Sequence, residues 1–301
     1  MQFPRNDTLE SSEEYLRTYV NCIVSQLIEF VKCLEFCILS SVVVLYLILC
    51  LSLYLILSNL DTLNRSSKGI KSKQRILFVT SHPDDECMFF APAILNLTRQ
   101  PDKNVFLLCL SCGDYYKQGK LRKEELWRSC AILGIPESNI FLQKVSALPD
   151  DPNVKWDENV IYNLVINYVE SLKFDAVVTF DKDGVSGHSN HKSIYYGLAN
   201  PVANKAFPEH CSVFCLDSVN KFRKYSIIFD LLLSICFSSN WFLLSPSECR
   251  LVKKALHAHK TQYLWYRKIY IWISRYAYMN TYSLLCANEA IFDIDYRHLS
   301  I

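Results

Sequence analysis

The sequence predicts an α/β protein: a mostly parallel β-sheet with helices on both faces, preceded by one N-terminal transmembrane helix. Two patterns support this fold class. From residue 75 onward, short apolar runs alternate with amphipathic, helix-like stretches, an order typical of a parallel sheet covered by helices. Before them, residues 36–60 contain no charged side chain. At 301 residues the chain has room for one good-sized domain and additional parts.

The expected strands are short and apolar, and each is followed by polar or turn-forming residues. They occupy residues 76–80, 105–111, 139–144, 175–180 and 212–216. The expected helices between them occupy residues 86–99, 122–133, 160–172 and 190–199. Acidic residues open the first helix, as the helix dipole favours, and Gly134 with Pro136 closes the second.

Residues 36–60 are the predicted membrane anchor. As a helix they would extend about 38 Å at 1.5 Å per residue, enough to cross a hydrocarbon core of about 30 Å with some tilt. A buried core helix and a signal peptide are the alternatives. The charged and polar residues among residues 1–35 and the length of the apolar run argue against a cleaved signal.

The charges on either side of the anchor predict its orientation. Residues 1–35 carry three basic against six acidic side chains, whereas residues 61–75 carry five basic against one acidic. A Lys/Arg excess marks the cytosolic side. We therefore expect a short lumenal segment at 1–35, a basic linker at 61–74 and a catalytic portion in the cytosol.

Composition excludes some classes of function. The net charge of +2 gives no overall attraction for nucleic acid, so no nucleic-acid partner is expected. The 13 cysteines show no regular spacing, which favours reduced thiols in a cytosolic domain over a disulfide framework. Cys109 and Cys112 form a lone CxxC pair, interpreted as small buried residues.

Residues 219–301 differ from the alternating region before them. Residues 225–244 are apolar but include Asp230 and Asn240, so we expect them to pack on the domain or lie at the membrane interface. Residues 263–272 mix aromatic and basic side chains, which suits interfacial docking or a helix that covers the core. The predicted organisation is an α/β core at 75–218 and a helical or interfacial region at 219–301 that completes it.

Two polar clusters follow expected strands. The pentad His82-Pro83-Asp84-Asp85-Glu86 comes after residues 76–80, and Gly187-His188-Ser189-Asn190-His191 comes after residues 175–180. In an open α/β sheet the carboxyl ends of the strands meet at one edge, where ligands bind. Imidazole and carboxylate are ligands that suit zinc. The two clusters together predict a mononuclear metal hydrolase.

Each cluster residue has an expected role. His82 and Asp85 from the first turn and His191 from the second would form a site with two histidines and one carboxylate. Asp84 points elsewhere and is the expected general base, and His188 would protonate a leaving amine or stabilise an oxyanion. The alternatives are that Asp84 only caps a helix and that the histidines are ordinary loop residues.

The two clusters resemble the N-acetylglucosaminyl-phosphatidylinositol de-N-acetylases, the PIG-L group. Further agreement lies in residues 87–92, 112–119, 122–126, 133–136, 149–152 and 259–262, so the resemblance covers about residues 75–285. It implies a Rossmann-like, zinc-dependent deacetylase on the cytosolic face of the endoplasmic reticulum. Such an enzyme acts in the second step of glycosylphosphatidylinositol anchor synthesis.

The resemblance also implies roles for single residues. Zn²⁺, or another divalent metal, would be held by three side chains: His82, Asp85 and His191. Asp84 would be the base, His188 the acid or oxyanion partner, and Arg122 a substrate-binding residue, unless Arg122 is a surface helix arginine. Asn190 stands where some bacterial relatives have Asp. Cys87 is expected to pack in the helix, and His257 and His259 receive no role.

The expected enzyme is thus a single-pass endoplasmic reticulum protein that hydrolyses the acetamide of a glycosylated phosphatidylinositol, with membrane lipids as its surroundings. Deacetylation of another N-acetylglucosaminyl conjugate is the first alternative, since none of the motifs indicates recognition of the lipid part of the substrate. A catalytically silent, phosphoinositide-binding scaffold is the second.

Overall fold

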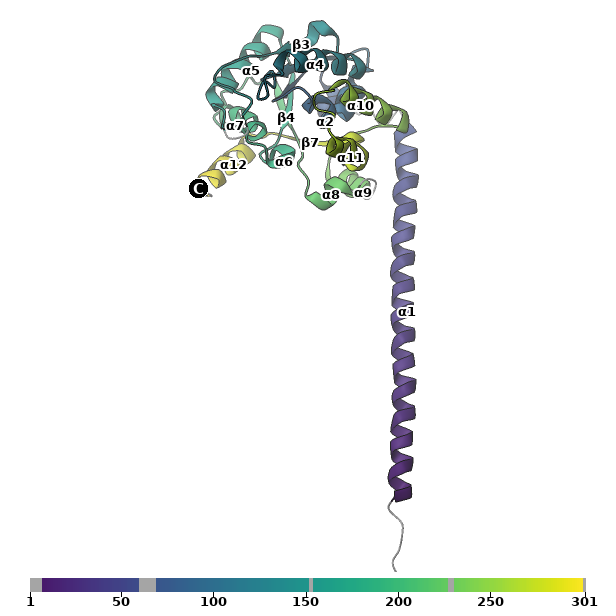
Figure 1. The fold of residues 1–301 in the computed structure, drawn as a ribbon. Coiled ribbons are helices and arrows are strands. Elements are labelled where there is room, and N and C mark those ends of the chain that lie inside the picture. The colour runs from purple at the N-terminus through teal and green to yellow at the C-terminus, as the bar shows by residue number, and fades with distance from the viewer. Residues whose placement is uncertain (1–6, 60–68, 152–153, 227–229, 300–301) are drawn as a thin grey trace, which may run out of the picture. The chain divides into compact units, whose positions relative to one another are not determined.

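The computed structural model describes residues 7–59, 69–151, 154–226 and 230–299 (Figure 1). It divides into two units, residues 1–52 and residues 53–301, which are described separately. The first unit consists of most of helix α1 (Asp7–Asn59). Within α1, Tyr15–Ser58 is long and apolar enough to cross a membrane, and its most apolar 18-residue window has a mean hydropathy of 2.7. The predicted anchor therefore lies in a longer helix. Residues 60–68, most of the predicted basic linker, lie outside the described parts.

The second unit is built on one sheet. Its described strands form a seven-stranded sheet in the order β3-β2-β1-β4-β5-β7-β6. The first five strands pair in parallel. They are β1 (Arg75–Thr80), β2 (Asn104–Cys109), β3 (Ile140–Leu142), β4 (Ala176–Phe180) and β5 (Ser212–Leu216). The chain builds outward from β1 to β3 and then returns to place β4 on the other side of β1. This strand order is Rossmann-like, so the predicted fold class is confirmed.

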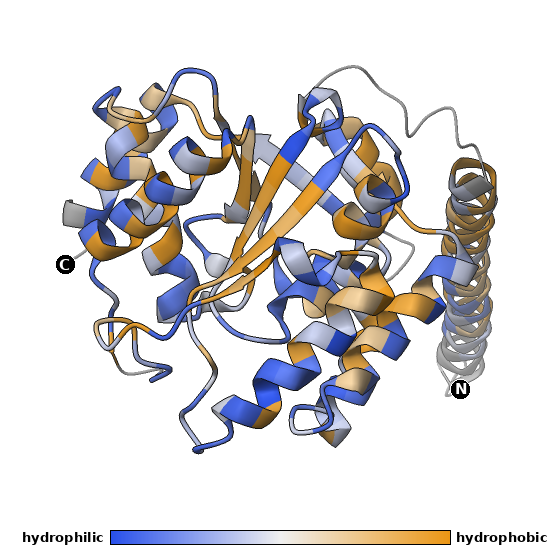
Figure 2. Ribbon diagram, turned by 90° about the horizontal axis from the view of Figure 1, so that it is seen from above, coloured by the Kyte–Doolittle hydropathy of each residue, from blue (hydrophilic) through white to orange (hydrophobic). Residues whose placement is uncertain are grey.

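Apolar strands explain why this sheet is internal. Apart from their first residues, β1, β2 and β5 are buried throughout, and β4 is buried along its whole length. Figure 2 shows the central strands as the most hydrophobic part of the unit. Figure 1 shows α5, α7 and α12 on one side of the sheet and α4, α10 and α11 on the other. Strands buried on both faces are the signature of parallel sheets.

The helices match the predicted order with shifted ends. The parallel part contains α4 (Gly119–Leu133), α5 (Glu158–Leu172), the short α6 (Gly184–Gly187) and α7 (Ser189–Ala203), with 3₁₀ turns η2 (Gly69–Ser72) and η3 (Glu137–Asn139). Gly134 ends α4 in the left-handed conformation, with a φ of 85°, as the sequence predicts. Asp157 caps α5 by accepting the Asn159 N–H.

The single helix predicted over residues 86–99 is wrong. The structure has two helices there, α2 (Asp85–Met88) and α3 (Ala91–Thr98). Pro92 lies in the first turn of α3, where a missing N–H costs nothing. At the break, Asn280 donates its side-chain amide to the Phe89 carbonyl at 2.8 Å and accepts the Ala93 N–H at 3.2 Å. A distant side chain therefore replaces the helical hydrogen bonds that the break removes.

The C-terminal region, residues 219–301, is not only helical. Its elements are α8 (Lys221–Tyr225), α9 (Asp230–Phe237), β6 (Asn240–Leu243), α10 (Pro246–Ala258), α11 (Trp265–Ile273), η5 (Arg275–Ala277), β7 (Met279–Leu284) and α12 (Ala287–Leu299). Strand β7 pairs antiparallel with both β5 and β6. The apolar residues 225–244 thus supply α9 and a sheet strand, with residues 227–229 outside the described parts.

Candidate active site

The turn after β1 has an unusual backbone that surrounding groups hold in place. Asp84 has a φ of 120°, a conformation that costs a non-glycine residue free energy. Its N–H donates to the Glu86 carboxylate at 2.9 Å, and the preceding Pro83 carbonyl accepts from Arg122 at 2.7 Å. Asp84 stands at the start of α2, but its side chain makes no capping hydrogen bond. Helix capping therefore does not explain this carboxylate.

The second cluster is positioned by the turns after β4. Gly184 and Val185 both have a positive φ, 60° and 59°. The Gly184 carbonyl lies 3.0 Å from Nδ1 of His191. The His191 ring stacks on Phe180, the last residue of β4, with ring centres 3.9 Å apart and an interplanar angle of 5°. The ring is therefore fixed on both its edge and its face.

The two clusters meet at the edge of the sheet between β1 and β4. One ligand atom from each of His82, Asp85 and His191 lies within 4.8 Å of the others, and all three residues are buried. Nε2 of His191 lies 3.4 Å from Asp85 Oδ1 but makes no hydrogen bond within the described parts. A buried imidazole nitrogen without a hydrogen bond is rare. This donor set and this nitrogen fit a divalent metal such as zinc.

His188 lies beside the other two imidazoles. Its ring centre is 4.9 Å from that of His191 and 5.0 Å from that of His82. His188 caps α7, and its Nδ1 accepts the Asn190 N–H at 3.3 Å. In the neutral ring, the hydrogen then sits on Nε2. The sequence placed His188 one helical turn before His191, and the structure does bring the two side chains together.

Burial and neighbouring charges shift the pKa values at this edge. Burial alone would raise the pKa of Asp85, but its interactions with His191 and His82 lower it below its usual range. Burial would lower the pKa of His82, yet the hydrogen bond to Asp150 and the nearby carboxylates raise it. Burial together with His191 and His82 lowers the pKa of His188 to about 4. His188 is therefore neutral near pH 7.

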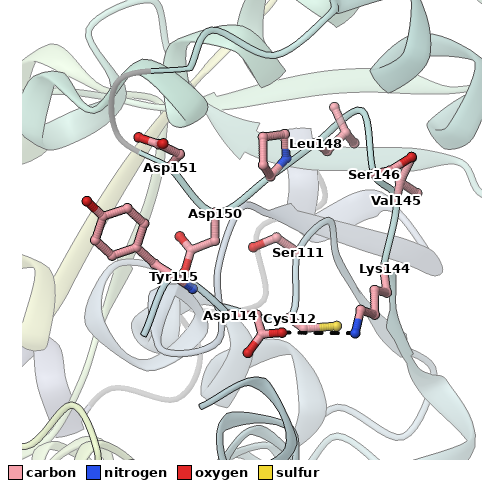
Figure 3. A pocket seen from close by; sticks show the side chains of 11 residues that line it. Ser111, Cys112, Asp114, Tyr115, Lys144, Val145, Ser146, Leu148, Asp150 and Asp151 are labelled. Atoms are coloured by element: carbon pink, nitrogen blue, oxygen red, sulfur yellow. Dashed lines mark hydrogen bonds and ion pairs between the residues drawn. The ribbon is translucent and has the colours of Figure 1, made fainter. Parts of the chain in front are cut away.

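A cavity of about 340 Å³ opens over these residues. His82, Asp84, Asp85, His188 and His191 all line it, together with cationic and tyrosine side chains from α8 and α11. A second cavity of about 520 Å³ lies beside it and shares Asp150. Figure 3 shows Asp150, Tyr115 and Asp151 along one wall and the Asp114–Lys144 pair along another. The two cavities therefore adjoin at Asp150.

Comparisons with known proteins place this arrangement in a family. Residues 77–201 match the PIG-L model, described as GlcNAc-PI de-N-acetylase. The chain is 43% identical over 212 residues to the N-acetylglucosaminyl-phosphatidylinositol de-N-acetylase of Bos taurus, covering 70% of this chain and 83% of the relative. It is 31% identical over 252 residues to a probable enzyme of that name from Dictyostelium discoideum, covering 72% and 96%. The chain belongs to the PIG-L de-N-acetylase family.

Membership makes the chain a hydrolase of the deacetylase class. A solved structure, N,N'-diacetylchitobiose deacetylase from Pyrococcus horikoshii, aligns with 15% identity and a TM-score of 0.49, covering 79% of this chain and 91% of that one. The family resemblance noted from the motifs is confirmed by the sequence relatives.

Arg122, predicted to bind substrate, makes its contacts inside the PIG-L domain. Its guanidinium donates to the carbonyls of Pro83 and Gly113, at 2.7 and 3.2 Å, and lies 3.4 Å from Asp150. It is buried, so it is not a surface helix arginine. These contacts brace the turn that carries Asp84. A direct contact with substrate stays a prediction, although Arg122 does line the cavity.

Asp150 is a site residue that the motifs did not single out. Its Oδ1 lies 3.0 Å from Nε2 of His82. The side-chain amide of Asn190 lies 3.1 Å from the same nitrogen. The loop after β3 and the start of α7 thus both reach His82. The only signal was the Pro149–Pro152 run, which contributed to the family resemblance without suggesting a role.

The C-terminal region, residues 219–301, supplies two further charged partners. Arg267 of α11 forms an ion pair with Asp84, 183 residues away in sequence. Nε2 of His259 lies 2.7 Å from Glu86, which also accepts a hydrogen bond from Ser129 at 2.5 Å. His259 and Glu86 are fully buried. Both residues adjoin the turn after β1, although no role was predicted for His259.

Cys87 belongs with that buried pair and not with the predicted metal ligands. Its Sγ donates to the Asp84 carbonyl at 3.2 Å. One ligand atom each from Glu86, Cys87 and His259 lies within 4.8 Å of the others. Burial raises the pKa of the Cys87 thiol well above its usual value. A protonated, buried thiol is a packing residue, as the sequence predicts.

Proposed function

We propose that this chain hydrolyses the acetamide of N-acetylglucosaminyl-phosphatidylinositol and releases acetate and glucosaminyl-phosphatidylinositol, the second step of glycosylphosphatidylinositol anchor synthesis. One observation carries the proposal. Three ligand-type side chains from two distant turns converge within 4.8 Å, and Asp84 and His188 line the same cavity. The named activity of the Bos taurus relative supports the substrate.

His82, Asp85 and His191 would hold Zn²⁺ or another divalent ion. Such an ion, when bound, polarises a carbonyl and makes water more acidic. The Asp84 carboxylate would accept the proton of the attacking water. Arg267 and Arg122 hold this carboxylate, since Arg267 forms an ion pair with it and an Arg122 nitrogen lies 3.7 Å from Asp84 Oδ1. A positioned base contributes about 10²–10⁴-fold to rate.

His188 would stabilise the oxygen that becomes negative as the amide carbonyl is attacked. Its Nδ1 already accepts a backbone hydrogen bond, so its Nε2 is free to donate toward the cavity that it lines. A donor aimed at a developing oxyanion is typically worth about 3–4 kcal/mol. The exchange of Asp for Asn at position 190 does not remove this donor, because the Asn190 side chain contacts His82.

Lys224 supports an anionic substrate. Its Nζ lies 3.5 Å from the Val185 carbonyl and 5.5 Å from the centre of the Tyr270 ring, and no acidic side chain of the described residues forms an ion pair with it. Burial lowers its pKa, so an ammonium at this place gains from a negative partner. A phosphodiester next to the sugar would provide that charge.

The proposal includes location. We propose that α1 anchors the chain in the endoplasmic reticulum membrane through residues 36–60, with residues 1–35 in the lumen and the deacetylase domain in the cytosol. The Lys/Arg excess after the span supports this orientation. Residues 61–74 would serve as the linker, residues 75–218 as the catalytic core and residues 219–301 as the region that completes it.

The test is a deacetylase assay on the glycolipid with purified full-length protein. Asp84→Asn should keep the metal, measured by mass spectrometry, and lose about 10³-fold in turnover. Chelation should abolish wild-type activity, and zinc should restore it. Turnover that survives both changes would overturn the mechanism. Preferential hydrolysis of a soluble N-acetylglucosaminyl conjugate over the lipid would support deacetylation of another conjugate. A purified protein without stoichiometric metal would support the catalytically silent scaffold.

A further inference from the structure

Helix α11 has two different faces. One face closes the catalytic cavity, because Arg267 pairs with Asp84 and Tyr270 lines the cavity wall. The opposite face carries Trp265, Ile269 and Trp272, which are 72%, 51% and 67% exposed. Their i, i+4, i+7 spacing puts them on one side of the helix. Large apolar side chains gathered on an exposed face indicate an interaction surface.

Helices α8 and α9 extend this apolar surface. Phe222 of α8 is 89% exposed and Phe237 of α9 is 82% exposed. On its other side, α8 contributes Lys224 and Tyr225 to the catalytic cavity. We call Phe222, Phe237, Trp265, Ile269 and Trp272 the aromatic rim. Of the helices that carry it, α8 and α11 also form one wall of the cavity.

Ion pairs and ring contacts hold these helices together. Asp230 of α9 pairs with Arg223 of α8, and it also lies 2.9 Å from Arg275 of η5. Lys224 lies over the ring of Tyr270 in α11. Figure 1 shows α8 and α9 grouped next to α11 at one end of the domain. The three helices that carry the aromatic rim therefore pack as one group.

The charge of this surface has one sign. Neither α8 nor α11 contains an acidic residue, and the Asp230 carboxylate of α9 is buried and paired. Lys221 and Lys268 are exposed beside the rim aromatics. Exposed tryptophan and phenylalanine with flanking lysine is the composition of surfaces that dock at a bilayer interface.

We propose that the aromatic rim inserts into the interfacial layer of a bilayer containing anionic phospholipid, so that the catalytic cavity opens onto the lipid headgroups. This deepens the proposed function and rests on it, because a glycolipid substrate stays in the bilayer and its sugar must reach the cavity. The rim's continuity with the cavity wall and its basic charge favour a membrane over a protein partner.

Tryptophan fluorescence tests the insertion in the full-length protein. The chain has five tryptophans, and none lies in α1, so a membrane-spanning α1 would give no signal. In nanodiscs of phosphatidylcholine and phosphatidylserine, brominated acyl chains should quench the wild type. The double variant Trp265→Phe, Trp272→Phe should lose most of that quenching, and Trp127→Phe should keep it. Equal quenching in the double variant and the wild type would overturn insertion and leave a protein as the partner.

Kinetics supply an independent readout. In the triple variant Phe222→Ser, Phe237→Ser, Trp265→Ser, the KM for glycolipid in vesicles should rise about tenfold with kcat kept. Turnover of the same headgroup without acyl chains should not change, which also shows that the variant is folded. The matched control is Phe292→Ser, a 65% exposed position on α12, and it should behave as wild type. An unchanged vesicle KM in the triple variant would contradict the proposal.

The two proposals fail in different ways. If the wild type hydrolyses neither form of the substrate, the proposed function is wrong, and the quenching experiment still decides whether the rim inserts. If the wild type is active but the double variant is quenched as strongly as the wild type, only the aromatic rim proposal is wrong. Should the triple variant lose activity on both substrates, it is misfolded and the quenching result decides.

Discussion

The parallel part of the domain and the C-terminal region contribute to one site in different ways. Between β1 and α7, the three candidate metal ligands come from turns that directly follow strands, so each side chain is positioned by local structure. The C-terminal region reaches the same turn only through long-range contacts, Arg267 to Asp84 and His259 to Glu86. The first region supplies the candidate metal ligands, and the second supplies ion-pair partners and part of the cavity wall.

The largest effect should come from a ligand of the first region. His191→Ala removes the imidazole that stacks on Phe180 and should abolish metal binding, with activity reduced by at least about 10³-fold. Mass spectrometry of the purified protein and the glycolipid assay measure both. A variant that keeps stoichiometric metal would show that the three side chains do not form the metal site.

His259→Ala should have the largest effect on stability. It leaves the buried Glu86 carboxylate without its imidazole partner, which typically costs about 3–5 kcal/mol in the free energy of unfolding. Chemical denaturation of the detergent-solubilised protein measures this. The control is His257→Ala, an exposed residue two positions earlier, expected to change stability by less than about 0.5 kcal/mol. If His257→Ala lowered the free energy of unfolding as much as His259→Ala, the buried His259–Glu86 pair would have no special role in stability.

Arg267→Met should reduce kcat about 10–100-fold, because Asp84 loses an ion-pair partner that holds it in the cavity. Metal content should stay at the wild-type value. Arg267→Lys should restore part of the loss, since it keeps the charge but not the fork geometry. If Arg267→Met were as active as the wild type, the C-terminal region would not contribute to the positioning of the base.

The smallest effect concerns Lys71, which lies before β1 and packs on Trp241 and Phe242 of β6 at 4.8 and 5.0 Å from the ring centres. Burial lowers its pKa from 10.5 to about 8. A charged Lys71 therefore destabilises the folded state. This cost is present in full below pH 8, where Lys71 is charged in both states, and it is absent above the unfolded pKa of 10.5, where Lys71 is neutral in both. The free energy of unfolding should rise by about 1–2 kcal/mol between these pH values.

Lys71→Met should remove that rise and be more stable than the wild type at neutral pH. Unfolding curves of both proteins at several pH values between 7 and about 10.5 test this. A wild-type rise that persists unchanged in the variant would have to come from other groups. The buried position of Lys71 against Trp241 and Phe242 would then not destabilise the folded state.

The sequence predicted the parallel half well for a physical reason. Buried parallel strands are continuous apolar runs, and ligands that follow them share one sheet edge, so local pattern sufficed to group His82, Asp85 and His191. It failed where contacts are distant. The break before Ala91 depends on Asn280, and β7 is a half-polar strand with exposed residues at its end.

The partners of the catalytic turn were missed for the same reason. Arg267 and His259 lie 183 and 173 residues from the groups they contact, and neither has a local pattern that marks it. Asp150 lies in a loop whose spacing carries no ligand signature. The loop lies beside His82 because β3 pairs with β2. The sequence predicts the order of these strands, but it does not predict which side chains of the loop come within hydrogen-bond distance of His82.

The ion pair between Arg267 and Asp84 has a consequence during synthesis. When the last of the three predicted ligands, His191, has been synthesised, about a third of the chain is still to be translated. That part includes Arg267, the ion-pair partner of Asp84. Chains released before that point carry an intact ligand set and a cavity with a missing wall. The contact between Arg267 and Asp84 therefore forms only after nearly all of the chain has been synthesised.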